Sequence, residues 1–167
     1  MNASNRRNWL AALAGLATAA LLPTAMSSSG ARLGKPKSEW KKLLPADRYE
    51  ILFEEGTERA GSSPLDREKR DGTFVCAACF QPLFDSSRKY DSGTGWPSFW
   101  EPLPAAVGTK TDFKLFLPRT EYHCARCGGH QGHVFDDGPK PTGLRYCNNG
   151  LALQFVPRGD KLPALRT

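Results

Sequence analysis

The hydrophobic pattern of the chain changes character after about 70 residues. Before that point, apolar side chains recur at helical spacing and predict a proline-started helix over residues 45–55 that is stopped by Gly56. A short helical turn over residues 38–44, with Ser38 as its N-cap, is predicted just before it. Residues 57–72 mix glycine, proline and charges, which is typical of a surface loop. The longer helix would bury three apolar side chains: Tyr49, Leu52 and Phe53.

Beyond the loop, apolar and polar residues alternate with a period of two, which indicates strands. Glycine and proline turns at 137–139 and 141–143 keep these segments short. Because strands and helices do not alternate after residue 60, we expect a mainly β fold with an antiparallel core and short helices at the N-terminal end. Four segments are predicted as strands: 113–117, 120–124, 144–149 and 151–156.

The N-terminus has the pattern of an export signal. Arg6 and Arg7 precede 14 residues without charge, from Trp9 to Leu22, and a small-x-small cleavage candidate follows at Ala25-Met26-Ser27. A charged start, an apolar stretch and a small-residue cleavage site are typical of a signal peptide. The arginine pair resembles the twin-arginine signal of bacterial export, although Asn5 stands where Ser or Thr is usual. We expect cleavage of this segment and export to a bacterial periplasm by the twin-arginine route; an uncleaved membrane-tethering segment is the alternative.

These observations divide the chain into four parts. Residues 1–27 form the expected signal peptide, 28–37 a small, polar and basic linker, 38–160 one domain, and 161–167 a tail. Apart from the signal segment before its cleavage, nothing in the sequence predicts membrane contact, since no apolar run reaches about 18 residues.

The net charge of +6 does not describe the folded body. Seven of the 23 basic residues and one of the 17 acidic residues lie in residues 1–42, so residues 43–167 carry 16 of each. A body with no net charge lacks the basic footprint of a nucleic-acid-binding protein, and we expect no nucleic acid partner.

Four of the five cysteines form two Cys-x2-Cys pairs with 44 residues between them. Two thiolates on one tight turn can reach one ion, and two such turns complete a tetrahedral sulfur site. This donor set favours one structural zinc over an iron–sulfur cluster. Two disulfides are the alternative in an exported protein, although a Cys-x2-Cys disulfide closes a very small loop. The four expected ligands are Cys76, Cys79, Cys124 and Cys127.

The fifth cysteine, Cys147, is left without a partner. A free cysteine is most often a small buried hydrophobe. If its segment is extended, however, Arg145, Cys147 and Asn149 share one face, where Arg145 would favour the reactive thiolate. His130 and His133 lie just beyond the second cysteine pair. Three interpretations are open for them: metal ligands, structural histidines, or acid–base groups beside Cys147.

An aromatic cluster follows a glycine-rich stretch at residues 91–100. Two glycines flank Thr94, and Trp96 precedes a proline, which biases it toward an extended backbone. An aromatic wall beside such a loop suits a small apolar pocket. The alternative is that the aromatic side chains fill the core, which suits Phe99 and Trp100 well.

From about residue 38 to about residue 156, the chain resembles the B-type peptide-methionine (R)-S-oxide reductases. The resemblance rests on several motifs together: the two Cys-x2-Cys pairs, Ser92-Gly93-Thr94-Gly95-Trp96-Pro97-Ser98-Phe99, Gly132-His133-Val134-Phe135, and Gly143-Leu144-Arg145-Tyr146-Cys147 with Asn149.

This resemblance implies two antiparallel sheets, a structural zinc on the four paired cysteines, and Cys147 as the nucleophile. Trp96 and Phe135 would hold the methyl group of the substrate, an oxidised protein or peptide. His130, His133 and Asn149 would hydrogen-bond the sulfoxide oxygen, with Arg145 beside the thiolate. Attack on the sulfoxide sulfur would release methionine and leave a sulfenic acid on the cysteine.

The chain departs from the family pattern at a few positions. Many members carry a resolving cysteine where Thr94 stands here, so this chain resembles a one-cysteine variant that needs an external thiol, either a thioredoxin-like protein or a small thiol. Asn148 replaces a usual aliphatic residue and is expected to face away from the pocket, and Gly150 stands where Ser is common.

Two rival functions remain: a zinc-knuckle binding module in which Cys147 is inert, and a thiol peroxidase or redox sensor.

Overall fold

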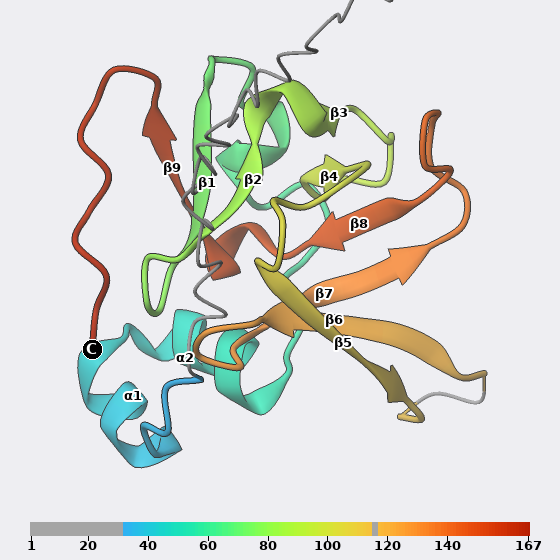
Figure 1. Cartoon of the computed structure of the whole chain (residues 1–167). Helices are drawn as coiled ribbons and strands as arrows, with labels where there is room; N and C mark the ends of the chain where they lie inside the picture. Colours follow the sequence, from blue (N-terminus) through green and yellow to red (C-terminus); the bar gives the residue numbers. More distant parts are fainter. Residues whose placement is uncertain (1–31, 115–116) are drawn as a thin grey trace, which may run out of the picture.

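The computed structural model describes residues 32–114 and 117–167 (Figure 1). The predicted signal peptide and residues 28–31 of the predicted linker lie outside the described residues. The described part of the chain folds into two antiparallel sheets and two short α-helices, which confirms the mainly β prediction. None of its helices is both long enough and apolar enough to span a bilayer.

Helix α1 spans Lys37–Leu43 and helix α2 spans Ala46–Glu54. Ser38 was the wrong N-cap, because Pro36 stands at that position and Pro45 has the same place before α2; neither helix has a side-chain cap. Proline fixes φ near the helical value, so the chain can enter each helix without a capping side chain. Gly56 does not end α2 either, since Glu55 takes the left-handed conformation, with φ of 56°.

A three-stranded sheet has the order β2-β1-β9, and a six-stranded sheet has the order β3-β4-β8-β7-β6-β5. In Figure 1 the larger sheet fans out to the right of the smaller one, with the helices at the lower left. The strands of the smaller sheet are β1 (Gly72–Cys76), β2 (Pro82–Asp85) and β9 (Leu153–Pro157). Those of the larger sheet are β3 (Lys89–Tyr90), β4 (Ser98–Phe99), β5 (Val107–Asp112), β6 (Arg119–Cys124), β7 (His130–Phe135) and β8 (Arg145–Asn148).

The strand predictions at 120–124 and 144–149 are confirmed by β6 and β8. The prediction at 151–156 is correct from residue 153, because residues Gly150–Ala152 form a 3-10 turn, η3, that leads into β9. The prediction at 113–117 was wrong for the residues of it that the structure describes: β5 ends at Asp112, and the side chains of Phe113 and Leu117 are 75% and 71% exposed. Apolar alternation indicates a buried face, but Phe113 and Leu117 lie in the connection between β5 and β6, in contact with solvent.

The core lies between the two sheets and is built from aromatic rings. Phe84 of β2 stacks on Phe99 of β4 with ring centroids 4.1 Å apart, and Phe74 of β1 meets Phe99 edge-on at 5.0 Å. All three side chains are fully buried. Phe99 therefore fills the core, as the alternative interpretation of the aromatic cluster predicted. Two further 3-10 turns, η1 (Pro64–Arg67) and η2 (Ser86–Arg88), lie in the connections around this core.

Both predicted flanking segments contact the domain. In the predicted linker, the Leu33 N–H donates to the Arg126 carbonyl over 2.7 Å. In the predicted tail, the Arg166 N–H donates to the Cys79 carbonyl over 3.0 Å, and its guanidinium donates to the Ala78 carbonyl over 2.9 Å. The segments before and after the domain thus hold the two turns that carry the paired cysteines.

Candidate metal centre and active site

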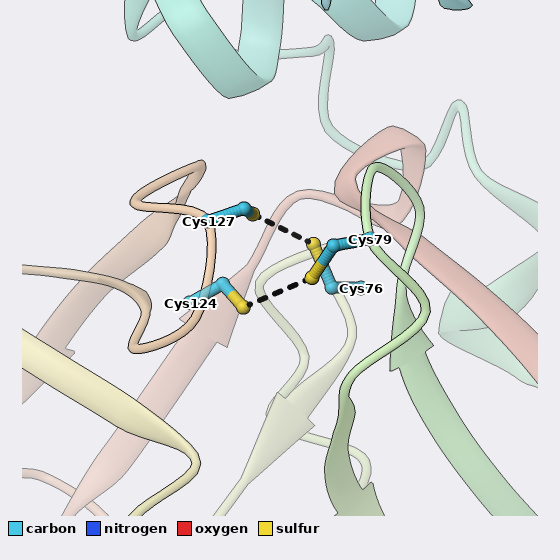
Figure 2. Close-up of side chains that lie close together, drawn as sticks. All are labelled: Cys76, Cys79, Cys124 and Cys127. Carbon is cyan, nitrogen blue, oxygen red and sulfur yellow. Dashed lines mark hydrogen bonds between the residues drawn. The ribbon is translucent and has the colours of Figure 1, made fainter. Parts of the chain in front are cut away.

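Two hairpin turns from different sheets bring the four paired cysteines together (Figure 2). The β1–β2 turn carries Cys76 and Cys79, and the β6–β7 turn carries Cys124 and Cys127. Their sulfur atoms lie within 4.8 Å of one another, all four side chains are buried, and the two facing pairs, Cys76–Cys127 and Cys79–Cys124, are each 3.6 Å apart.

The two turns share one backbone geometry. In each, the residue after the second cysteine adopts a left-handed conformation: Phe80 with φ of 64° and Gly128 with φ of 75°. In each, the N–H of that residue donates to the carbonyl of the first cysteine over 2.9 Å. This tight closure turns both thiols of a pair toward the same point, which explains the spacing of two residues between them.

The donor set fits a tetrahedral metal ion. A zinc ion with bonds of about 2.3 Å to four sulfurs places neighbouring sulfurs about 3.8 Å apart, close to the observed 3.6 Å. Crowding among the thiols raises the pKa of Cys127 and lowers that of Cys79, because thiols of the cluster hydrogen-bond one another, first of all to Cys124. A cation between the sulfurs removes this conflict, since it stabilises all four thiolates at once.

Cys147 lies apart from that cluster, in β8 at the middle of the six-stranded sheet. Its direct partner on β7 is His133, and its direct partner on β4 is Ser98. Directly paired residues project from the same face of a sheet, so Cys147, His133 and Ser98 share one face. The strands approach closely here because β7 has glycine at residue 132: a Cβ there would lie 1.9 Å from the Cys147 carbonyl oxygen.

A cavity of about 130 Å³ opens at Cys147. Trp96 and Phe135 supply aromatic walls, and Cys147 and His133 contribute a thiol and an imidazole. A cavity of this size admits a small side-chain end group and not a large cofactor. The lining residues are Thr57, Trp96, Arg119, Gly132, His133, Phe135, Cys147, Asn148 and Asn149.

His133 is held by a carboxylate. Its Nε2 lies 2.7 Å from Asp112 Oδ2, which also accepts a hydrogen bond of 2.8 Å from Arg119. Burial lowers the pKa of His133, against the opposing effect of Asp112. The pKa of Asp112 is lowered by the Lys114 N–H and then by His133. A neutral His133 that donates from Nε2 to the carboxylate leaves Nδ1 free to accept a proton.

His130 lies behind His133 and does not line the cavity. Its side chain is buried, with Nδ1 2.8 Å from Glu121 Oε1, and its ring centroid lies 5.5 Å from that of His133. His123 approaches the other oxygen of Glu121 at 3.0 Å. Burial alone would raise the pKa of Glu121, yet its hydrogen bonds with His123 and His130 lower it to about 2. The prediction that His130 contacts a substrate oxygen stays a prediction.

Arg145 also stays outside the cavity lining and supports one wall. Its Nε and NH2 groups donate to the two oxygens of Asp137 over 2.7 and 2.8 Å, and its guanidinium lies 4.3 Å from the Phe135 ring centroid. Burial raises the pKa of the Cys147 thiol, while the charge of Arg145 and the Thr94 hydroxyl oppose that rise. In the free protein, desolvation therefore outweighs the electrostatic help that the sequence predicted from Arg145.

Asn149 lies at the end of β8, where its side-chain amide spans two segments. Its Oδ1 accepts from the Glu58 N–H, and its Nδ2 donates to the Gln131 carbonyl, each over 3.1 Å. One of the two amide hydrogens thus remains for another acceptor. Asn148 is among the residues that line the cavity, but its side chain points to the other face of β8, as alternation predicts, where its Oδ1 accepts a 2.6 Å hydrogen bond from the buried Tyr122 hydroxyl.

Known proteins were compared with this chain. The family model for the SelR domain matches residues 44–157. A protein named peptide methionine sulfoxide reductase MsrB from Pseudomonas syringae pv. syringae (strain B728a) is 49% identical over 128 residues, which cover 76% of this chain and 98% of that protein.

The chain belongs to the SelR-domain family. Similar identity extends to distant organisms. An MsrB from Leptospira interrogans is 49% identical over 124 residues, or 74% of this chain and 95% of that protein. The chloroplastic peptide methionine sulfoxide reductase B1 of Arabidopsis thaliana is 51% identical over 120 residues, or 71% of this chain and 59% of that protein.

The structure of this SelR-domain protein shows site residues that the sequence analysis missed. Glu58 lies in the segment predicted as a surface loop, yet its side chain is buried and accepts from the N–H groups of Gly150 and Leu151 over 2.6 and 2.9 Å. Its carbonyl accepts from Trp96 Nε1 over 3.2 Å. Asp112 was also missed. The hydrophobic pattern predicted a strand at residues 113–117, whereas the strand that brings Asp112 to His133 is β5, which ends at residue 112.

Proposed function

We propose that this SelR-domain protein reduces the R epimer of methionine sulfoxide in peptides and proteins to methionine, as a repair reaction after oxidation. Family membership supports the reaction class. The observation that carries the proposal is the Cys147 thiol, paired with His133 across β7 and β8 in a small cavity between aromatic walls. Trp96 and Phe135 fit the methyl group of the substrate, which is small and apolar.

The proposed reaction begins with transfer of the Cys147 proton to His133, whose Nδ1 can accept it. The thiolate then attacks the sulfoxide sulfur and forms a sulfur–sulfur bond. That bond breaks as the oxygen passes to Cys147, so a new sulfur–oxygen bond to Cys147 replaces the one in the substrate. The proton held by His133 and stabilised by Asp112 ends on that oxygen. Methionine leaves, and Cys147 becomes a sulfenic acid. The proton and electron balance closes: sulfoxide is reduced by two electrons and the thiol is oxidised by two.

Regeneration would use an external thiol. Among the described residues, Cys147 is the only cysteine outside the four-sulfur cluster, and the glycine loop carries Thr94 in place of a cysteine. One thiol would condense with the sulfenic acid, releasing water and leaving a mixed disulfide, and a second thiol would then release Cys147. A thioredoxin-like protein or a small thiol meets this need.

The four-cysteine cluster would hold one structural zinc ion. Its donor set is closed and buried, and it leaves no open position for a substrate. When bound, the ion would fasten the β1–β2 turn to the β6–β7 turn and so hold the two sheets together. The chemistry of the reaction would remain with Cys147 and His133.

The test follows both epimers of a methionine-sulfoxide peptide, with dithiothreitol as the reductant and zinc-loaded protein as the enzyme. We expect loss of the R epimer alone, and no loss with Cys147→Ser. Hydrogen peroxide is offered in parallel, since a thiol peroxidase would consume it without a sulfoxide. A folded, zinc-loaded protein that leaves both epimers intact would favour the binding-module alternative.

We further propose export to the periplasm by the twin-arginine route. The support is the sequence of residues 1–27, which lies outside the described structure. A reporter fused to this segment should be exported, and the double substitution Arg6→Lys with Arg7→Lys should stop export. Export that survives the double substitution would point to the general secretory route.

A further inference from the structure

The connection between helix α2 and turn η1 is tied to the loop that carries Trp96. Within residues 57–63, the Glu58 carbonyl accepts a hydrogen bond from Trp96 Nε1 over 3.2 Å, and the Gly61 N–H donates to the Gly95 carbonyl over 2.7 Å. A Cβ on Gly95 would lie 2.9 Å from the Gly61 nitrogen, so this close approach needs glycine. The indole ring is therefore held both by its own N–H and by the backbone just before it.

Glu58 is also tied to the segment that follows β8. Its carboxylate is buried and spans the start of turn η3, where Oε1 accepts from the Gly150 N–H over 2.6 Å and Oε2 accepts from the Leu151 N–H over 2.9 Å. The Glu58 N–H donates to Asn149 Oδ1 over 3.1 Å. One residue thus uses its carbonyl on the Trp96 side, and its N–H and both carboxylate oxygens on the other.

The two segments that Glu58 joins both line the cavity at Cys147. Trp96 and Asn149 are lining residues, and so is Thr57, the residue before Glu58. The separation of Trp96 from Asn149 is thereby set by the main chain of a single residue and two hydrogen bonds. A rigid pocket of about 130 Å³ is sensitive to the size of its ligand. One methylene more or less in a fitted apolar pocket changes the rate by about 10–200-fold.

We propose that Glu58 is a positioning residue that fixes the distance between Trp96 and Asn149 and so restricts the cavity to methyl sulfoxides. This inference rests on the proposed function and deepens it, because it names the group that the cavity should reject: a sulfoxide with an ethyl group in place of the methyl group. Glu58 does not line the cavity, so it acts through the two residues that it binds.

A carboxylate is the group that this position requires. It offers one acceptor oxygen to each of the two N–H groups, those of Gly150 and Leu151. A glutamine side chain has one acceptor oxygen and one NH2 donor, so one of these N–H groups would face another donor. A buried N–H without an acceptor is unfavourable. We therefore expect Glu58→Gln to move residue 58 away from η3 and to loosen its hydrogen bonds with Trp96 and Asn149.

The first test measures hydrogen exchange of the indole N–H groups by NMR, in the full chain loaded with zinc and without any sulfoxide. Trp40 is the internal reference, because its ring is fully buried and stacks on Phe53 with centroids 5.4 Å apart. Glu58→Gln should accelerate exchange at Trp96 about tenfold and leave Trp40 unchanged. The matched control is Glu39→Gln on α1, whose side chain is 51% exposed, and it should change neither rate.

The second test compares two peptides, one with the R sulfoxide of methionine and one with the corresponding ethyl sulfoxide, with dithiothreitol as the reductant. The unchanged protein should prefer the methyl substrate at least about tenfold in kcat/KM. Glu58→Gln should lose most of this preference, chiefly through a higher KM for the methyl substrate. A residue with a merely structural role would lower both rates in proportion and keep their ratio.

Glu58→Asp is the second variant, for use if Glu58→Gln does not fold. It keeps the charge and both acceptor oxygens but is one methylene shorter, so contact with η3 should draw the main chain of residue 58 away from Trp96. The same two changes are expected: faster exchange at Trp96 alone and a weaker preference for the methyl substrate.

Three results would overturn the proposal. Equal acceleration at Trp40 and Trp96 would make Glu58 a structural residue, an unchanged rate at Trp96 would show that Glu58 does not anchor it, and an unchanged substrate ratio would remove its role in specificity. The exchange test needs no turnover. An unchanged protein that reduces neither sulfoxide would refute the reductase proposal and the specificity role with it, while the exchange rates would still decide whether Glu58 anchors Trp96.

Discussion

The five cysteines occupy two sites that differ in almost every physical respect. The four paired cysteines are buried on two turns, and each reaches its neighbours through a fixed local spacing. Cys147 is partly exposed in the centre of a sheet, and its neighbours come from other strands through register. The first site is closed and its donor set suits a structural metal ion, whereas the second opens into a cavity beside an imidazole. The same thiol group thus has opposite surroundings in the two sites.

The largest effect is expected from a substitution that removes one sulfur of the closed site. Cys124→Ser removes one of four sulfurs that join the two sheets, so the protein should lose its metal and its cooperative thermal transition. Structural zinc contributes on the order of 10 kcal/mol in small domains, which equals or exceeds the total stability of a typical domain. Metal analysis and a thermal melt measure this. Cys147→Ser is the matched control, and it should keep both the metal and the transition; retention of metal by Cys124→Ser would refute the four-cysteine site.

The second prediction concerns Asp112, which contacts His133 of the open site and does not line the cavity itself. The Asp112 carboxylate holds His133 and would stabilise its protonated form, and Asp112→Asn removes that charge. We therefore expect kcat to fall by about 10² while the metal content stays constant. Asp137→Asn is the control, because its carboxylate holds Arg145 instead. Equal losses from both substitutions would show that a general loss of negative charge, and not the orientation of His133, is responsible.

Sequence analysis recovered the closed site in full because its information is local. The spacing of Cys76 and Cys79, repeated 48 residues later in the chain, specified the turn geometry directly. The open site was predicted from Cys147 and the family resemblance, but the buried carboxylates around it were not predicted. Glu58 and Asp112 lie far away in sequence, and only strand register and loop packing bring them to the cavity. A buried carboxylate in an apparent surface loop has no local pattern that distinguishes it from a solvated one.

The third prediction concerns pH and separates the two sites. Because burial raises the pKa of the Cys147 thiol, the thiolate fraction increases as pH rises toward and beyond 9, so the rate at which iodoacetamide alkylates Cys147 should increase over that range. Arg145→Met removes a charge that opposes the rise and should shift the profile to higher pH. The thermal transition of the zinc-loaded protein should change little over the same interval. A profile for Arg145→Met that coincides with the wild-type profile would assign Arg145 to wall support alone.

The smallest expected effect lies at the edge of the closed site, in the tail that the sequence placed outside the domain. The guanidinium of Arg166 donates to the Ala78 carbonyl and lies 4.4 Å from the Phe80 ring centroid, so it packs directly on the first cysteine turn. One charged hydrogen bond and one cation–π contact together suggest that Arg166→Ala lowers the free energy of unfolding by about 1–2 kcal/mol. Thermal melts at fixed zinc concentration should show a decrease in Tm of a few degrees.

Arg158→Ala supplies the matched control for that measurement. Arg158 pairs with Asp85 at 3.3 Å, but its side chain is 60% exposed, and exposed pairs contribute about 0–1 kcal/mol. If both substitutions lower Tm equally, the tail contributes only surface charge. If Arg166→Ala alone lowers Tm, and the difference shrinks when excess zinc is added, then the tail acts on the metal turn. The closed site would in that case extend beyond its four sulfurs to the end of the chain.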